Sequence, residues 1–178
     1  IAIEGVAMAQ GHALWCDNFT PLCMSLPHFA PLRDRDYPPL FGDARPPVIA
    51  NEINSDTLHA LHANAERARV QDHIQVFHGD FRDLHPDRVM QAATGAECGL
   101  IVVNPPYGQR AESKGAGDPE VADLYEDLRE WWHDLGVGWR LGILSDHPDV
   151  PSIFGRRCQL EKPVSNGQLK AWFRVYEE

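Results

Sequence analysis

Apolar and polar residues alternate along the chain in blocks that predict strands and helices in turn. Short runs rich in Val, Ile and Leu predict strands, because β-branched residues favour extended backbone and the runs are short. The predicted strands cover residues 47–51, 74–78, 100–103 and 140–145. Helical periodicity predicts helices over residues 1–9, 54–69, 86–93 and 119–135. Strands separated by helices imply right-handed crossovers and a mainly parallel sheet.

The end of the chain departs from this alternation. Residues 158–164 and 168–176 both look like strands, and they flank Ser165-Asn166-Gly167. Asn-Gly between two strands is the strongest short signal for a hairpin. The sequence therefore predicts an α/β fold whose mainly parallel sheet ends in an antiparallel hairpin.

Residues 11–46 show neither the apolar periodicity of a helix nor the short β-branched runs of a strand. They are rich in Pro, Asp and aromatic residues, which predicts an irregular insertion anchored to the core by its rings. Stacking of bases on these rings is a weaker alternative.

The chain begins at Ile1, and residues 1–9 already read as an apolar helix without a start signal. We therefore expect a piece of a longer protein.

Length and composition indicate one globular domain. The chain has 178 residues, of which 43% are hydrophobic, and no apolar run is long enough to span a bilayer. Its four cysteines are scattered, which favours free thiols in a reducing cytoplasm over a Cys16–Cys23 bridge. His59 and His62 have helical spacing but lack the His-Glu-x-x-His pattern of a metal site. We predict a cytoplasmic protein with no membrane contact and no metal.

Net charge sets a limit on partners. A value of −10 with a pI near 5.3 argues against a stand-alone nucleic-acid binder, which usually has a basic surface. Basic residues nevertheless gather in the segment 154–174, where Glu161 is the sole acidic residue; an ordinary solvated surface is the alternative. The basic residues of that segment are Arg156, Arg157, Lys162, Lys170 and Arg174.

The most informative motif is Asn104-Pro105-Pro106-Tyr107, which directly follows a predicted buried strand. In an open α/β sheet, ligands bind at the carboxyl ends of the strands. The Asn104 side-chain oxygen and the Pro105 carbonyl are two acceptors that can hold the hydrogens of an amine. The Tyr107 ring can stack on a planar group, and the prolines stiffen the loop. A turn that merely ends a strand is the plain alternative.

With these residues the sequence resembles the class I S-adenosylmethionine-dependent methyltransferases. It is most similar to the RNA guanine-N2 methyltransferases whose upstream part carries a THUMP domain. Three marks carry the resemblance: residues 104–108 followed by Arg110, the helix with Asn64-Ala65-Glu66-Arg67-Ala68, and the closing segment 165–169. The resemblance covers nearly the whole chain except residues 11–46. The resemblance implies a Rossmann-like methyltransferase fold, S-adenosylmethionine as cofactor, and ribosomal or transfer RNA as partner.

The same resemblance assigns roles to individual residues. Asn104, Pro105, Pro106 and Tyr107 would form the catalytic motif, and Tyr107, Gly108 and Arg110 would bind the substrate base. On the cofactor side, Glu52 would bind the ribose hydroxyls, Asp80 would accept from the adenine amine, Phe81 would pack on the ring, and Asn104 would contribute. Asn54 either helps there or caps its helix, and we favour the cap.

The resemblance also implies that part of the fold lies outside the sequence. The first strand and the glycine-rich loop of such enzymes should precede Ile1. We therefore expect residues 1–178 to be a partial methyltransferase catalytic domain, with an RNA-binding domain further upstream. By itself the fragment should bind S-adenosylmethionine poorly and be weak or inactive.

Two other functions stay open at this point. The four-residue motif also serves DNA adenine-N6 methylation and protein glutamine methylation, although glutamine methylases usually follow the tyrosine with an aliphatic residue rather than Gly108. A truncated, non-catalytic scaffold is the third reading.

Overall fold

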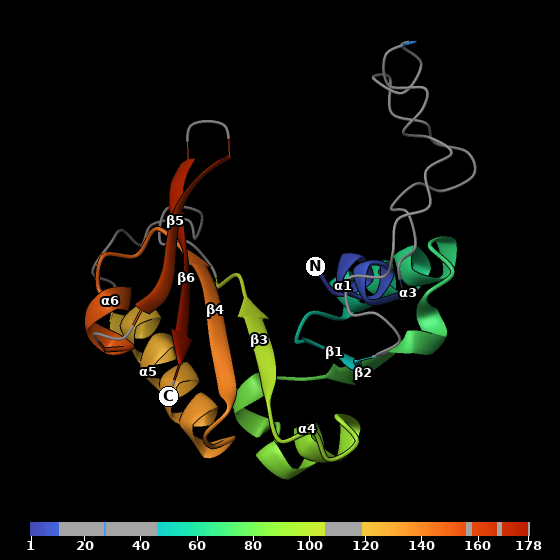
Figure 1. Ribbon diagram of the computed structural model, residues 1–178, viewed down its shortest axis with the longest axis horizontal. Coiled ribbons are helices and arrows are strands. Elements are labelled where there is room, and N and C mark those ends of the chain that lie inside the picture. Colours follow the sequence, from blue (N-terminus) through green and yellow to red (C-terminus); the bar gives the residue numbers. More distant parts are fainter. Residues whose placement is uncertain (11–26, 28–45, 106–118, 156–157, 167–168, 178) are drawn as a thin grey trace. The chain divides into compact units, whose positions relative to one another are not determined.

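The computed structural model describes residues 1–10, 27, 46–105, 119–155, 158–166 and 169–177 (Figure 1). The chain divides into two compact units. Residues 1–83 and 92–94 form the first, and residues 84–91 and 95–178 form the second. The described part of each unit has its own sheet, with strand order β1-β2 in the first and β3-β4-β6-β5 in the second.

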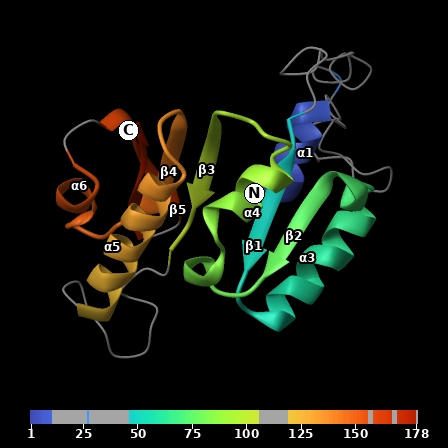
Figure 2. The same ribbon diagram turned by 90° about the horizontal axis from the view of Figure 1, so that it is seen from below.

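The first unit is a parallel strand pair covered by helices (Figure 2). The pairing runs from Val48↔Ile74 to Glu52↔His78. Val6 of α1 and Ala65 of α3 pack with Val70 and Ile74 in one buried cluster, so both helices contribute to the same core. Its elements are α1 (Ala2–Gln10), β1 (Val48–Glu52), α3 (Ser55–Arg67), η2 (Gln71–His73), β2 (Ile74–His78) and η3 (Phe81–Asp83).

Helix α3 begins at the cap that the sequence indicates. The Asn54 side-chain oxygen accepts hydrogen bonds from the backbone N–H groups of Asp56 and Thr57, at 2.9 and 3.0 Å. These bonds satisfy two of the amide groups that a helix start leaves without partners. The other end was predicted too late in the chain: the helix stops at Arg67 rather than at residue 69, and Ala68 is its exposed C-cap residue.

The second unit holds a mixed sheet. β3 and β4 are parallel, whereas β6 runs antiparallel to both β4 and β5. This confirms the predicted α/β class with its closing hairpin. The turn position was wrong, because pairing continues to Asn166↔Leu169 and Asn166 is thus the last residue of β5. The elements are α4 (Pro86–Ala92, which ends in the first unit), β3 (Gly99–Val103), α5 (Pro119–Asp134), β4 (Trp139–Ser145), α6 (Val150–Ile153), β5 (Cys158–Asn166) and β6 (Leu169–Glu177).

The core of this unit lies between α5 and one face of the sheet. Leu141, Ile143 and Ser145 alternate along β4 and are all fully buried, so they point to the same side. Trp132 of α5 is 1% exposed, and its indole Nε1–H donates to the Trp139 carbonyl at 2.7 Å. A buried indole N–H usually needs such a partner. The bond therefore ties α5 to the start of β4.

Tyr176 carries a buried hydroxyl that has no hydrogen-bond partner among the described residues. Burial raises the pKa of Tyr176 to about 12, because the phenolate would lose its hydration. Tyr176→Phe keeps the ring against Phe154 and removes the unpaired group. We expect the free energy of unfolding at pH 7 to stay level or to rise by about 1 kcal/mol.

The pH dependence provides the check on Tyr176. Because the pKa of Tyr176 is raised on folding, the folded state keeps its full stability below the unfolded pKa, about 10. Stability then falls as pH rises towards 12, since the unfolded chain ionises its tyrosine first. Denaturant unfolding at several alkaline pH values should show this loss in the natural chain and a smaller one in Tyr176→Phe. Identical alkaline profiles would contradict the burial of an ionisable hydroxyl.

Both sheets have a strand with one neighbour among the described residues. β1 pairs with β2, and β3 pairs with β4. On β3, Leu100 and Val102 are 53% and 37% exposed.

Within the described ranges, no helix is long and apolar enough to cross a bilayer. Cys98 and Cys158 are free thiols there.

Candidate functional site

Two predicted cofactor residues lie at the carboxyl ends of paired strands in the first unit. Glu52 is the last residue of β1 rather than the residue after it, and its partner His78 ends β2. Asp80 follows two residues beyond His78. Because β1 and β2 are parallel, both carboxylates lie towards the same end of the strand pair. Phe81 opens the short helix η3 and is half-buried.

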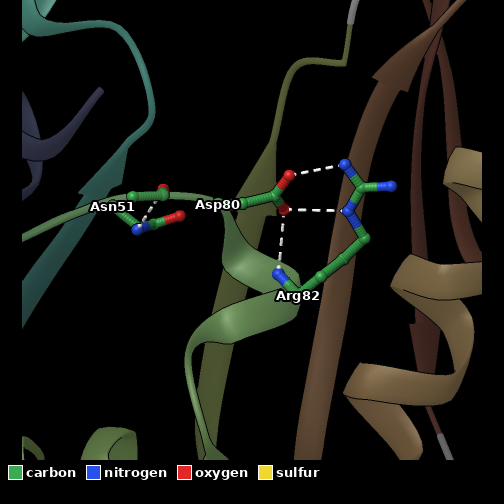
Figure 3. A network of polar contacts seen from close by, with 4 residues as sticks. Asn51, Asp80 and Arg82 are labelled. Atoms are coloured by element: carbon green, nitrogen blue, oxygen red, sulfur yellow. Dashed lines mark hydrogen bonds and ion pairs between the residues drawn. The ribbon is translucent and has the colours of Figure 1, made fainter.

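Backbone and side-chain bonds hold these two strand ends together (Figure 3). The Asn51 side-chain amide donates to the Gly79 carbonyl at 3.1 Å. The Gly79 N–H donates to the Glu52 carbonyl at 3.0 Å. Gly79 has a φ of 139°, which residues with a Cβ rarely adopt, so glycine is needed at this bend. Glu52 itself accepts from the Asn54 N–H through Oε1, at 2.8 Å.

Asp80 already has a partner, Arg82, which sequence reasoning missed (Figure 3). Asp80 Oδ1 accepts from the Arg82 backbone N–H and from Nε, both at 3.0 Å, and Oδ2 lies 2.5 Å from Nη2. These hydrogen bonds lower the pKa of Asp80, since they favour the carboxylate. The Asp-x-Arg sequence shortly after a strand is the signal that could have predicted this ion pair. Any acceptance from an adenine amine would have to share this carboxylate with Arg82.

The predicted catalytic motif belongs to the second unit. Asn104 and Pro105 directly follow β3; Asn104 is exposed and Pro105 half-buried. Pro106, Tyr107, Gly108 and Arg110 lie outside the described residues, so their predicted roles stay predictions. Two acceptors, the Asn104 side chain and the Pro105 carbonyl, thus follow the carboxyl end of a parallel strand.

A buried polar network lies at the carboxyl end of the neighbouring strand. The Tyr125 and Ser145 hydroxyls are 2.7 Å apart, and the Ser145 oxygen also accepts from the His147 N–H at 3.0 Å. His147 Nδ1 accepts from the Asp149 N–H at 3.3 Å. Tyr125 and Ser145 are 20 positions apart, and no sequence motif links them. The network fixes the backbone just after β4, the strand that pairs with β3.

The described residues hold no cluster of metal ligands, and a hollow in the first unit lies away from Glu52 and Asp80. No group of three or more metal-ligating side chains occurs among the described residues. A hollow of about 310 Å³ in the first unit is lined by Val6, Val48, Asp72, His73 and Ile74, among others. Val48 and Ile74 begin their strands, so this hollow lies at the opposite ends of β1 and β2 from Glu52 and Asp80.

Comparison with known proteins assigns the chain to a family. Residues 1–173 match the model of the RMKL-like methyltransferase domain. The chain belongs to this methyltransferase family. Over 130 residues it is 27% identical to the ribosomal RNA large subunit methyltransferase K/L of Pseudomonas aeruginosa; the match covers 72% of the chain and 17% of that protein.

Solved structures give the same fold. One is SMU.472 complexed with SAH, with a TM-score of 0.67 and 18% identity over 99% of the chain and 44% of that protein. Another is a possible methylase from Clostridium difficile 630, with a TM-score of 0.68 and 23% identity over 99% of the chain and 43% of that protein. The chain spans less than half of either solved protein, and about a sixth of the curated relative.

Proposed function

We propose that this chain is the catalytic part of an enzyme that methylates the exocyclic amine of guanine in ribosomal or transfer RNA. One observation carries the proposal: in a chain of a methyltransferase family, Asn104-Pro105 directly follows the carboxyl end of parallel strand β3. The name of the Pseudomonas aeruginosa relative favours ribosomal RNA as the substrate class. Cytoplasmic location and an upstream RNA-binding domain remain part of this proposal.

The proposed cofactor is S-adenosylmethionine, which supplies an electrophilic methyl group on a sulfonium. The donor set of the first unit suits its nucleoside part. Glu52 accepts a hydrogen bond from the Asn54 N–H through Oε1. A carboxylate has room for further bonds, as two ribose hydroxyls require. Asp80 and Phe81 would receive the adenine. The SAH in the related SMU.472 structure supports the same cofactor class.

The main task of the chain in this reaction is to position the acceptor amine against the methyl group. Methyl transfer is an in-line displacement, so holding the acceptor at the right distance and angle supplies much of the acceleration. The lone pair of a guanine amine is delocalised into the ring. The Asn104 side-chain oxygen and the Pro105 carbonyl would accept the two amine hydrogens and so help localise that pair on nitrogen. Tyr107 would stack on the base, which must leave its helix if it is paired.

The experiment uses the whole natural protein with methyl-labelled S-adenosylmethionine and three acceptors. They are unmodified ribosomal and transfer RNA, duplex DNA, and a release-factor-like protein. We expect label in RNA, on the guanine amine after digestion to nucleosides. Label confined to DNA or to protein glutamine would replace the proposal by one of those substrates, and no label in any acceptor would favour a non-catalytic scaffold.

A calorimetric titration tests the expected dependence on sequence outside this chain. We expect S-adenosylmethionine to bind the whole natural protein and to bind the 178-residue chain weakly or not at all, because Glu52, Asp80 and Phe81 provide contacts only for the nucleoside part. Tight, stoichiometric binding to the 178-residue chain would show that no further segment is needed.

A further inference from the structure

The β5–β6 hairpin has two chemically different faces. Residues directly paired in an antiparallel ladder share a face. Lys162 and Val164 lie on one face, opposite Phe173 and Ala171. The other is called the Trp172 face here. It is made of the pairs Glu161↔Arg174, Pro163↔Trp172 and Ser165↔Lys170.

Trp172 is exposed yet held in place. The residue is 38% exposed, and the Arg174 guanidinium lies 5.4 Å from the ring centroid. Arg174 Nε donates to Glu161 at 2.7 Å, and Arg174 is 8% exposed. The pair with Glu161 fixes the guanidinium, and the cation–π contact fixes the ring. A ring that is ordered before a ligand arrives loses little entropy on binding.

The Trp172 face lies beside the catalytic motif. Trp172 pairs with Ser145 at the end of β4, and Val103 pairs with Ile143 two residues earlier. Asn104 and Pro105 therefore follow β3 at about the level of Leu144 and Ser145. Two strand spacings, about 10 Å, separate that level of β3 from β6. Strands β5 and β6 extend past the carboxyl ends of β3 and β4 (Figure 1). Lys170 pairs with Ser165 two residues beyond the last β4–β6 pair, so it lies on this extension.

The charge near Trp172 favours a partner that carries phosphates. On the Trp172 face the Arg174 charge is offset by Glu161, and Lys170, opposite Ser165, adds one further positive charge to a protein whose net charge is −10. A flat exposed ring next to a lysine suits a polymer that has both planar bases and phosphates. Base–aromatic stacking is a recurring mode of single-strand recognition.

We propose that the Trp172 face binds single-stranded RNA next to the target nucleotide, with one base stacked on Trp172 and a phosphate near Lys170. The proposal rests on the proposed RNA function and adds to it a second contact, made by a different element. It also gives a reason for an exposed tryptophan at this end of the sheet.

The test measures RNA affinity of the whole natural protein by fluorescence anisotropy. The probe is a labelled single-stranded RNA of mixed sequence, titrated at several salt concentrations. Trp172→Ala should weaken binding by about 5- to 100-fold, the effect of losing one stacked base, and Trp172→Phe should recover part of it. Lys170→Ala should lower the slope of log affinity against log salt by about 0.7, as for one phosphate contact on a single strand.

The opposite face of the hairpin supplies matched controls. Val164 is as exposed as Trp172, at 38%, and Lys162 has the same charge as Lys170. Val164→Ala and Lys162→Ala should leave affinity and salt slope unchanged. Equal effects from both faces would overturn the proposal, since they would indicate a general contribution of hairpin charge or stability.

Measuring turnover as well as affinity distinguishes a failure of this proposal from a failure of the proposed function. If the natural protein methylates RNA, Trp172→Ala should raise KM by about the same factor as Kd while changing kcat less. Methylation of RNA with unchanged affinity in Trp172→Ala would overturn the Trp172 face alone. RNA binding that depends on Trp172 without any methylation would support the face and contradict the proposed function. Binding of proteins but no RNA would overturn both.

Discussion

Replacing Asn104 by alanine should lower kcat for RNA methylation by about 100-fold or more, as loss of a preorganised polar group at a reacting centre does. The substitution removes one of two acceptors for the amine hydrogens. Asn104 is exposed directly after β3, so alanine should be tolerated structurally. KM for RNA should change less than kcat, because the bond matters most while the amine is becoming a nucleophile. Steady-state kinetics of the whole natural protein measure both.

Two comparisons make the Asn104 result specific. Asn104→Asp keeps an acceptor oxygen but adds charge, so it should retain more activity than Asn104→Ala. Val137→Ala, at a residue that is 82% exposed, should behave as the natural protein. A kcat within a few-fold of natural for Asn104→Ala, with normal S-adenosylmethionine binding, would rule out the proposed role of this side chain.

The largest effect on stability is expected at Trp132. Trp132→Ala should lower the free energy of unfolding by about 3–5 kcal/mol, the usual range for truncating a buried tryptophan. The side chain is 1% exposed, lies near Phe154, and donates to the Trp139 carbonyl. Alanine would leave a cavity between α5 and the sheet and would also leave that buried carbonyl without its donor.

Denaturant unfolding of the 178-residue chain tests this expectation, and Trp132→Phe serves as the graded control. Phenylalanine retains much of the apolar volume but cannot donate to Trp139, so it should fall between alanine and the natural chain. A loss below about 1 kcal/mol for Trp132→Ala would mean that the site relaxes or that this part of the core adds little.

Local sequence predicted the elements well where one strong signal decided them. Strand β2 was predicted at its observed bounds because Ile74-Gln75-Val76-Phe77-His78 is a β-branched and aromatic run. Asn54 was recognised as a cap because its side chain acts on amides only two and three residues away. Helix α6 was missed, since four residues that include Pro151 give no periodicity.

The polar contacts between distant segments were beyond local reasoning. The Tyr125–Ser145 hydrogen bond depends on how α5 packs on β4, which no spacing in the sequence encodes. Helical periodicity also did not distinguish Trp131 from Trp132. Trp131 is half-buried and donates to the Leu84 carbonyl, whereas Trp132 is fully buried in the core. By contrast, Glu52 and Asp80 could be predicted to lie near each other, because parallel strands place their carboxyl ends at the same edge of a sheet.

Strand β3 has a consequence for handling the protein. Its five residues carry no charge and no proline, and Leu100 and Val102 are exposed beside its single described partner. Natural edge strands usually carry lysine, proline or a bulge that discourages pairing between molecules. Concentrated solutions of the isolated chain should therefore associate by intermolecular strand addition, whereas a larger protein could use the same row of backbone donors and acceptors to seat another strand.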